Sequence, residues 1–285
     1  MTNVSRAGDR AATIVSAVVA SVLLLFLAGP TVGLVGAGGA GGLRRLASDA
    51  ELRAALALTA LTATTATLVG VVGGTPIGYV LARRSFRGRA LVAAVLDLPL
   101  LIPHPVAGIA LLLALGRGSP LGRELFDAGV RVAGSRLGIV CAMLFVSVPL
   151  YISGAREAFA RVDARYEAVA RTLGDTPWRA VRRVTLPLAA RGLLAAAVVM
   201  WARAVSEFGA IVVLTYNPKV ASVLSYDRFA SYGLREALPV AAVLVVLALV
   251  PLAALRALRV EGGGKSDEGR ELRISPSSLF PRRPQ

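Results

Sequence analysis

The sequence has little of what disulfide-bonded domains and metalloenzymes rely on. Its 285 residues include one cysteine, Cys141, and one histidine, His104. A single cysteine within an apolar run excludes a disulfide framework and is typical of a small buried side chain. One histidine and no paired aspartates within the apolar runs argue against a membrane enzyme, which would need a cluster such as H-E-x-x-H.

The sequence also lacks a nucleotide-binding loop and a cleavage site. The glycine-rich stretch GLVGAGGAGG at 33–42 has no following lysine, so it cannot hold ATP phosphates as G-x-x-x-x-G-K-[ST] does. The same stretch offers no A-x-A site, and we therefore expect the first apolar run to remain as an uncleaved helix. Any ATP-driven step would therefore need a partner.

What the sequence has in abundance is apolar residues. They make up 55% of the chain, and the mean hydropathy is +0.67. Several continuous runs reach the length that a bilayer-spanning helix needs, without the two-residue alternation of a β-barrel. We predict an all-α polytopic membrane protein with a single transmembrane domain over 12–258. The expected spans are 12–36, 52–82, 90–115, 136–155, 188–214 and 238–258.

The charge distribution predicts the orientation of these spans. The net charge is +15 and the isoelectric point is near 11.3, but no soluble basic domain is present to bind nucleic acid. Lys and Arg are about twice as frequent in one alternate set of connecting segments as in the other. This bias predicts a cell-membrane protein whose two termini, 1–11 and 259–285, are cytoplasmic. The Gly-, Ser- and Pro-containing tail at 259–285 is expected to be disordered.

One charged segment, 156–187, interrupts the apolar runs. An apolar stripe at helical spacing is followed by Gly174, a candidate left-handed cap. Thr176 and Pro177 then provide the cap and first position of another helix. The pattern predicts two short helices around a tight turn, which either lie on the membrane surface or dock a cytoplasmic partner. The residues of the stripe are Phe159, Val162, Tyr166, Val169 and Leu173.

Glu167, Gly174 and the ending Val184-Thr185-Leu186-Pro187 resemble the signature loop of ABC importer permeases. That loop has Glu-Ala-Ala, three residues, Gly, nine residues, and Ile-x-Leu-Pro. Here the spacing from Gly174 matches, although the glutamate comes one residue early. The resemblance implies the type I importer permease fold and docking to a cytoplasmic ATP-binding subunit. The implied docking residues are Glu167, Ala168, Ala170, Arg171, Gly174, Val184, Leu186 and Pro187.

The same resemblance carries expectations about the assembly. It implies two copies of the ATPase subunit, which use ATP and Mg, and a second copy of this chain. It also implies an extracytoplasmic substrate-binding protein. The chain itself is expected to bind no cofactor or metal, and to contact membrane lipid but no nucleic acid.

Two stretches resemble the molybdate/tungstate permeases in particular, especially their archaeal branch. They are 201–242, which contains Ser206-Glu207-Phe208-Gly209 and a Tyr-x-Pro-Lys element, and IPHPVAGIALLLALGRGSPLG at 102–122. The resemblance covers roughly residues 55–258. Sulfate/thiosulfate permeases share the Glu-Phe-Gly element and stay open as an alternative. Molybdate and tungstate cannot be separated, because the two dianions are nearly the same size.

Ionisable groups inside the expected spans have two interpretations. Arg203 and Glu207, four residues apart, either neutralise each other or line the path of an anion. Asp97 and His104, which lie beside prolines, either cap a local kink or line that path. The candidate pathway or gate residues are Arg203, Ser206, Glu207, Phe208, Gly209, His104 and Asp97. In the outer loop, Tyr216, Lys219 and Arg228 either contact the binding protein or are simply solvated.

Two further classes remain as alternatives. A secondary transporter would need an inverted internal repeat, which the sequence does not display, and the charged segment would then have no role. A structural membrane protein would leave the same segment unexplained.

Overall fold

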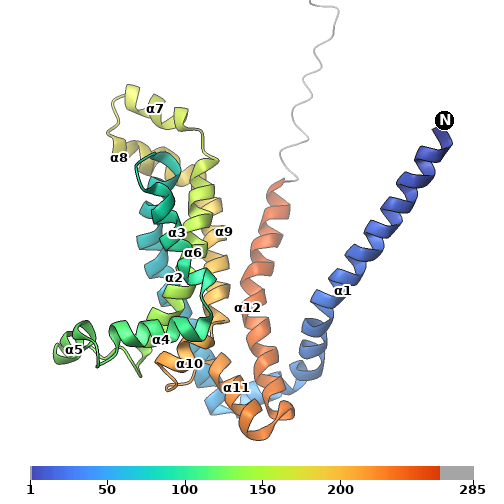
Figure 1. Cartoon of the computed structure of the whole chain (residues 1–285), viewed down its shortest axis with the longest axis vertical. Helices are drawn as coiled ribbons and strands as arrows, with labels where there is room; N and C mark the ends of the chain where they lie inside the picture. The colour runs from blue at the N-terminus through green and yellow to red at the C-terminus, as the bar shows by residue number, and fades with distance from the viewer. Residues whose placement is uncertain (1, 264–285) are drawn as a thin grey trace, which may run out of the picture.

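The computed structural model describes residues 2–263, and every regular element within this range is helical (Figure 1). The all-α prediction is therefore confirmed. The helices are α1 (Thr2–Ser48), α2 (Ala50–Arg83), α3 (Arg89–Leu101), α4 (His104–Leu115), α5 (Pro120–Asp127), α6 (Arg136–Ala160), α7 (Ala164–Thr172), α8 (Pro177–Ala180), the π-helix η1 (Val181–Thr185), α9 (Leu186–Val205), α10 (Gly209–Leu214), α11 (Ala221–Tyr232) and α12 (Leu234–Gly263).

Among residues 2–263, five helical segments are long and apolar enough to cross a membrane. The helices α3 and α4 form a sixth span if this bent pair is counted as one. This pattern fits a polytopic membrane protein. The five segments are Ala12–Ser48, Ala50–Arg83, Arg136–Ala160, Pro177–Val205 and Leu234–Pro251.

Two of the expected spans are interrupted in the structure. The segment expected at 90–115 bends by 113° between α3 and α4. Pro103 and Pro105 each remove a backbone donor, and Ile102 before the first proline is extended (φ −83°, ψ 142°), so the helix cannot continue. The segment expected at 188–214 ends as a helix at Val205 and resumes at Gly209 as α10.

Several helices begin at a residue whose side chain caps the first turn. Asp49, Ser119, Ser135 and Asp163 each accept a hydrogen bond from a backbone N–H in the first turn of α2, α5, α6 and α7, respectively. These bonds satisfy N–H groups that have no partner within their helix. Polar residues between apolar runs therefore define where the helices start.

The centre of the bundle is built from α2, α6 and α9, packed through small residues. A Cβ atom placed on Gly154 would lie 2.6 Å from Cβ of Ala196, and one on Gly192 would lie 2.6 Å from Cβ of Ala158. Such distances are below van der Waals contact, so α6 and α9 approach as closely as they do only because these positions are glycine.

The two ends of the bundle carry different elements (Figure 1). The helices α7 and α8 lie at one end, toward which the N-terminus and the end of α12 also point. The helices α4, α10 and α11 lie at the opposite end. Helix α1 diverges from the central helices (Figure 1). Its C-terminal part packs against the start of α12, where Gly38 and Gly42 lie against Leu238 and Pro239. Helix α12 continues to Gly263, and the rest of the tail expected to be disordered lies outside the described residues.

Candidate functional site

The 156–187 segment forms the two short helices that the sequence predicts. Gly174 has φ +98°, its N–H donates to the carbonyl of Arg171, and the N–H of Asp175 donates to that of Ala170. This is the Schellman arrangement, in which a glycine in the left-handed region ends a helix. Thr176 then caps α8 through the Arg179 N–H, with Pro177 at the first position. The tight turn is therefore fixed by local chemistry.

The apolar stripe of this segment is divided, which differs from the single helix face expected. Helix α6 ends at Ala160 and α7 begins at Ala164 after the Asp163 cap. Phe159 and Val162 are buried against the bundle, whereas the remaining three side chains of the stripe are exposed, Leu173 by 84%. Together with Trp178, which is 68% exposed, they are the large exposed apolar side chains of residues 164–180, and we call this set the apolar patch. Its members are Tyr166, Val169, Leu173 and Trp178.

Glu167 points back to the bundle and away from this patch. One carboxylate oxygen accepts a hydrogen bond from the hydroxyl of Thr185 (2.6 Å) and lies 3.2 Å from Nε of Arg83, while the other accepts from the hydroxyl of Tyr79 (2.9 Å). The side chains of Arg83 and Glu167 are only 13% and 17% exposed. Glu167 therefore ties α7 to the end of α2 and to η1.

The other predicted docking residues are distributed over both sides of the segment. Ala170 is buried, Val184 and Leu186 are half-buried, and Ala168, Arg171 and Pro187 are exposed. The π-helix η1 lies just before Pro187, and the N–H of Leu186 bonds the carbonyl of Val181 five residues back. Because proline has no N–H and its ring would clash with the carbonyl four residues earlier, the wider turn accommodates it.

A second cluster joins the two interrupted spans, and we call Arg203, Glu207 and His104 the Arg203 cluster. Nη2 of Arg203 lies 2.8 Å from Oε2 of Glu207 and 2.5 Å from Nε2 of His104. Oε1 of Glu207 accepts the N–H of Ala210, across the break between α9 and α10. Arg203 and Glu207 thus form an ion pair, as in the first of the two interpretations, and His104 from α4 joins them. Arg203 lies in the last turn of α9, nearer the end of its span than the boundary at 214 suggested.

Glycine allows α4 and α10 to meet beside this cluster. A Cβ on Gly209 would lie 2.7 Å from Cβ of His104, and one on Gly108 would lie 2.7 Å from the carbonyl oxygen of Ala210. Ser206 bonds the carbonyl of Arg203, and the Phe208 ring packs on Tyr226 with centroids 4.9 Å apart. The predicted pathway residues on α4, on α9, in the break at 206–208 and on α10 are therefore brought together.

Asp97 does not belong to this group. It lies on α3 and lines a small hollow against α2 and α6 that also contains Arg156. No hydrogen bond or ion pair of Asp97 occurs among residues 2–263. The structure therefore separates Asp97 from the other candidate pathway residues.

The residues predicted to lie in an outer loop are engaged within the chain. Asp227 accepts hydrogen bonds from Lys219 (2.6 Å) and from the hydroxyl of Tyr216. These bonds, with that of Lys219 the stronger, lower the pKa of Asp227, and the same contact raises the pKa of Lys219. Arg228 is buried and bonds Asp49 (2.7 Å) and Glu51 (3.1 Å) at the start of α2. Burial opposes the ionisation of Asp49, but the Leu52 N–H and Arg228 outweigh it and lower the pKa of Asp49.

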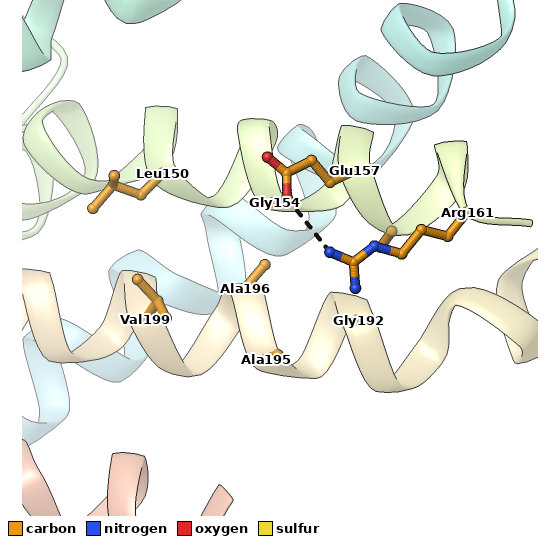
Figure 2. A pocket seen from close by; sticks show the side chains of 9 residues that line it. Leu150, Gly154, Glu157, Arg161, Gly192, Ala195, Ala196 and Val199 are labelled. Carbon is orange, nitrogen blue, oxygen red and sulfur yellow. Dashed lines mark ion pairs between the residues drawn. The ribbon is translucent and has the colours of Figure 1, made fainter. Parts of the chain in front are cut away.

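A separate groove runs between α6 and α9 (Figure 2). It measures about 280 Å³, and its floor consists of small residues such as Gly154, Gly192 and Ala195. Glu157 and Arg161 form an ion pair of 3.9 Å at one end, with both side chains mostly exposed. Such a pair contributes little to stability. None of the predicted site residues lines this groove.

The pattern of spans and the 156–187 segment can now be compared with known families. The family described as the binding-protein-dependent transport system inner membrane component matches residues 74–259. The chain belongs to this family. The matched region contains both the 156–187 segment and the Arg203 cluster.

Several curated relatives of this membrane component are molybdate or tungstate proteins by name. The molybdate/tungstate transport system permease protein WtpB of Thermococcus kodakarensis is 45% identical over 176 residues, covering 62% of this chain and 66% of the relative. The molybdenum transport system permease protein ModB of Mycobacterium tuberculosis is 38% identical over 200 residues, covering 70% and 74%. The chain therefore matches about two thirds of the length of the archaeal relative.

Solved structures share the fold of this membrane component. A bacterial ABC transporter that imports the acidic polysaccharide alginate has a TM-score of 0.66 at 18% identity, covering 90% of this chain and 97% of that chain. The MetNI methionine ABC transporter has a TM-score of 0.59 at 18% identity, covering 73% and 94%. At these identities the likeness concerns the fold alone.

Three residues of the Glu167 contact, Tyr79, Arg83 and Thr185, were not predicted. Tyr79 and Arg83 lie more than 80 positions before Glu167, and no local pattern links them. The only available signal was their spacing of four residues, which places them on one face of α2.

Proposed function

We propose that this chain is the membrane-spanning permease subunit of an ATP-driven importer for molybdate and tungstate. The proposed substrate rests on the 38–45% identity to relatives named as molybdate or tungstate permeases. The Ser206–Gly209 element that resembles that group lies at the break where the Arg203 cluster is assembled. A sulfate/thiosulfate permease is the alternative, and no observation favours it.

The proposed site of coupling is the apolar patch at the end of α7 and α8. The patch has four exposed apolar side chains, and one of them, Trp178, lines a hollow together with Arg179, Arg182 and Arg183. An apolar surface rimmed by cations suits a protein partner with an acidic rim. The partner proposed here is a cytoplasmic ATPase, present in two copies, because the chain has no phosphate-binding loop. ATP and Mg would be bound by that subunit.

In this proposal Glu167 transmits the movement of the ATPase and does not contact it. Its bonds to Tyr79, Arg83 and Thr185 connect α7 directly to α2 and η1. A displacement of the patch would therefore move the spanning helices as well. The complete importer would contain a second copy of this chain and an extracytoplasmic binding protein, with both termini of the permease in the cytoplasm.

Reconstituted transport tests this function. The chain, its ATPase and its binding protein would be placed in proteoliposomes, and uptake of molybdate, tungstate and sulfate would be measured with and without internal ATP. A hydrolysis-deficient ATPase is the control. We expect ATP-dependent uptake of the first two anions. Uptake of sulfate alone would replace the substrate, and uptake without ATP would contradict the coupling to an ATPase.

A further inference from the structure

Of the two charged side chains in the Arg203 cluster, the cationic one is the more exposed. The side chain of Arg203 is 21% exposed, whereas that of Glu207 is 1% exposed. Both hydrogen bonds of the guanidinium leave from Nη2. Within residues 2–263, Nε and Nη1 of Arg203 donate no hydrogen bond. The guanidinium therefore presents a free N–H edge on the side away from Glu207.

This edge cannot face lipid at low cost. A charged side chain that faces lipid is unfavourable, and non-helical backbone at membrane depth occurs only where it is buried or lines a water-filled cavity. Both the α3–α4 and α9–α10 breaks adjoin Arg203. The free edge therefore faces water or another protein surface.

Arg203 lies toward one end of its span. Leu186 begins α9, and a rise of about 1.5 Å per residue places Arg203 about 26 Å further along the helix. That is close to the thickness of the hydrocarbon core. The next elements, α10 and α11, lie at the end of the bundle opposite α7 and α8 (Figure 1). In the orientation of the proposed function, Arg203 is at the outer mouth.

We propose that Arg203 is a transit site where a divalent tetrahedral oxyanion first binds as it enters the path. Planar guanidinium N–H groups bind such oxygens in pairs, which a lysine ammonium does not. Glu207 keeps the cation partly neutralised, so the anion binds weakly enough to leave again. His104 positions Arg203 by accepting from Nη2, which puts the imidazole proton on Nδ1, a buried atom without a hydrogen-bond partner among the described residues. This inference rests on the proposed function and deepens it.

The arrangement gives Arg203 and Glu207 opposite effects on anion binding. Arg203→Gln removes the positive charge and the planar guanidinium donors, and we expect binding to weaken by roughly tenfold or more, as for the loss of one charge-assisted hydrogen bond. Glu207→Gln keeps an oxygen for the Ala210 N–H but removes the competing charge, so binding should become several-fold tighter. A merely structural cluster would instead weaken binding in both variants, or leave it unchanged. Arg191→Gln is the matched control, because Arg191 is exposed at the other end of α9.

Equilibrium dialysis of labelled molybdate against the purified permease–ATPase complex, without binding protein, measures this binding. The rate of uptake in proteoliposomes is measured in parallel. We expect this rate to fall about tenfold in Arg203→Gln and by less in Arg203→Lys. Two results would overturn the inference: binding and uptake that are equal in wild type and Arg203→Gln, or binding that changes in the same direction in Arg203→Gln and Glu207→Gln. The proposed function would still stand in either case, provided that the wild-type complex imports molybdate. A wild-type complex that imports neither molybdate nor tungstate would overturn the function itself, and with it the anion assigned to Arg203.

Discussion

At the scale of single residues, Glu167 shows how one carboxylate can fix the position of a whole segment. It is the only acidic partner of Arg83 among the ion pairs of residues 2–263. Glu167→Ala would leave the mostly buried Arg83 without a counter-ion and remove the acceptor of two hydroxyls. We expect a loss of roughly 1–3 kcal/mol in the free energy of unfolding, the cost of an unsatisfied buried polar group. Thermal unfolding in detergent measures it.

Glu157 provides the control for this prediction. It also pairs with an arginine, but both side chains are mostly exposed and the separation is 3.9 Å. Glu157→Ala should therefore change the melting temperature little. If Glu167→Ala melted at the wild-type temperature and kept wild-type ATP consumption per molybdate imported, Glu167 would not have the transmitting role.

Asp227 gives a second prediction at this scale, one that depends on pH. Its pKa is lowered in the folded protein, so its contribution to stability is present above the ordinary aspartate pKa of about 3.9 and is lost as the pH falls through the folded value. Because the pKa of Lys219 is raised in the folded protein, the contribution of Lys219 to stability is lost only as the pH rises through that folded-state pKa.

The measurement for Asp227 is the melting temperature of wild type and Asp227→Asn across pH. Wild type should be more stable at neutral pH, and the difference should shrink both below about pH 4 and in the alkaline range of lysine. Asp127→Asn is the control, since Asp127 is exposed and has no ion pair among residues 2–263. A difference that stayed constant from neutral pH down to pH 3 would mean that the contact contributes through shape alone.

The sequence predicted which of these residues are charged but not where their partners lie. Arg228 was expected either to contact a binding protein or to be solvated, and its ion pairs with Asp49 and Glu51, more than 170 positions away, were not predicted. Glu167 was expected at the docking surface, yet it faces α2. Long-range pairs of this kind depend on how the helices assemble, and helix assembly leaves no periodic signal in the sequence.

At the scale of elements, the turn between α7 and α8 depends on the backbone of Gly174. Its φ of +98° lies where an L-residue with a Cβ is strained, while the space around the Cα atom is open. Gly174→Ala should therefore cost about 1–2 kcal/mol through conformation alone. We expect α8 to change its angle to α7 and ATP-driven uptake to fall, with the protein still inserted. Uptake and thermal unfolding together measure both effects.

Gly73→Ala is the matched control for this turn. Gly73 also has open space around it but sits inside α2 with helical φ, so alanine there should be neutral or slightly stabilising. Wild-type uptake by Gly174→Ala would show that the angle of the turn does not matter for coupling.

Elements were predicted well where the signal was local. Gly174, Thr176 and Pro177 determine a turn through their own backbone chemistry, and the structure has that turn. The π-helix η1 and the break at 206–208 were not predicted, although Pro187 and the residues around Ser206 were visible. The wider turn of η1 accommodates Pro187, whereas the break at 206–208 accompanies the close contact of α4 with α10, which hydropathy alone cannot express.

At the scale of the whole molecule, the arrangement of the helices allows the orientation to be tested. The N-terminus, the end of α12 and the 156–187 segment lie toward one end of the bundle, and α11 lies at the other (Figure 1). The excess of Lys and Arg in the segments of the first end predicts that this end is cytoplasmic. Because Cys141 is the only cysteine in the sequence, a single cysteine introduced into a Cys141→Ala background is the only site that a thiol reagent can label.

Two exposed positions distinguish the orientations. Thr172 lies at the end of α7, and Ser231 lies on α11. In intact cells a membrane-impermeant maleimide should label Ser231→Cys but should label Thr172→Cys only after permeabilisation, because a charged reagent cannot cross the hydrocarbon core. The Cys141→Ala parent should stay unlabelled in both conditions. Labelling of Thr172→Cys in intact cells would place the α7–α8 patch outside, where no cytoplasmic ATPase could reach it, and the proposed coupling would then be wrong even if the chain transports molybdate.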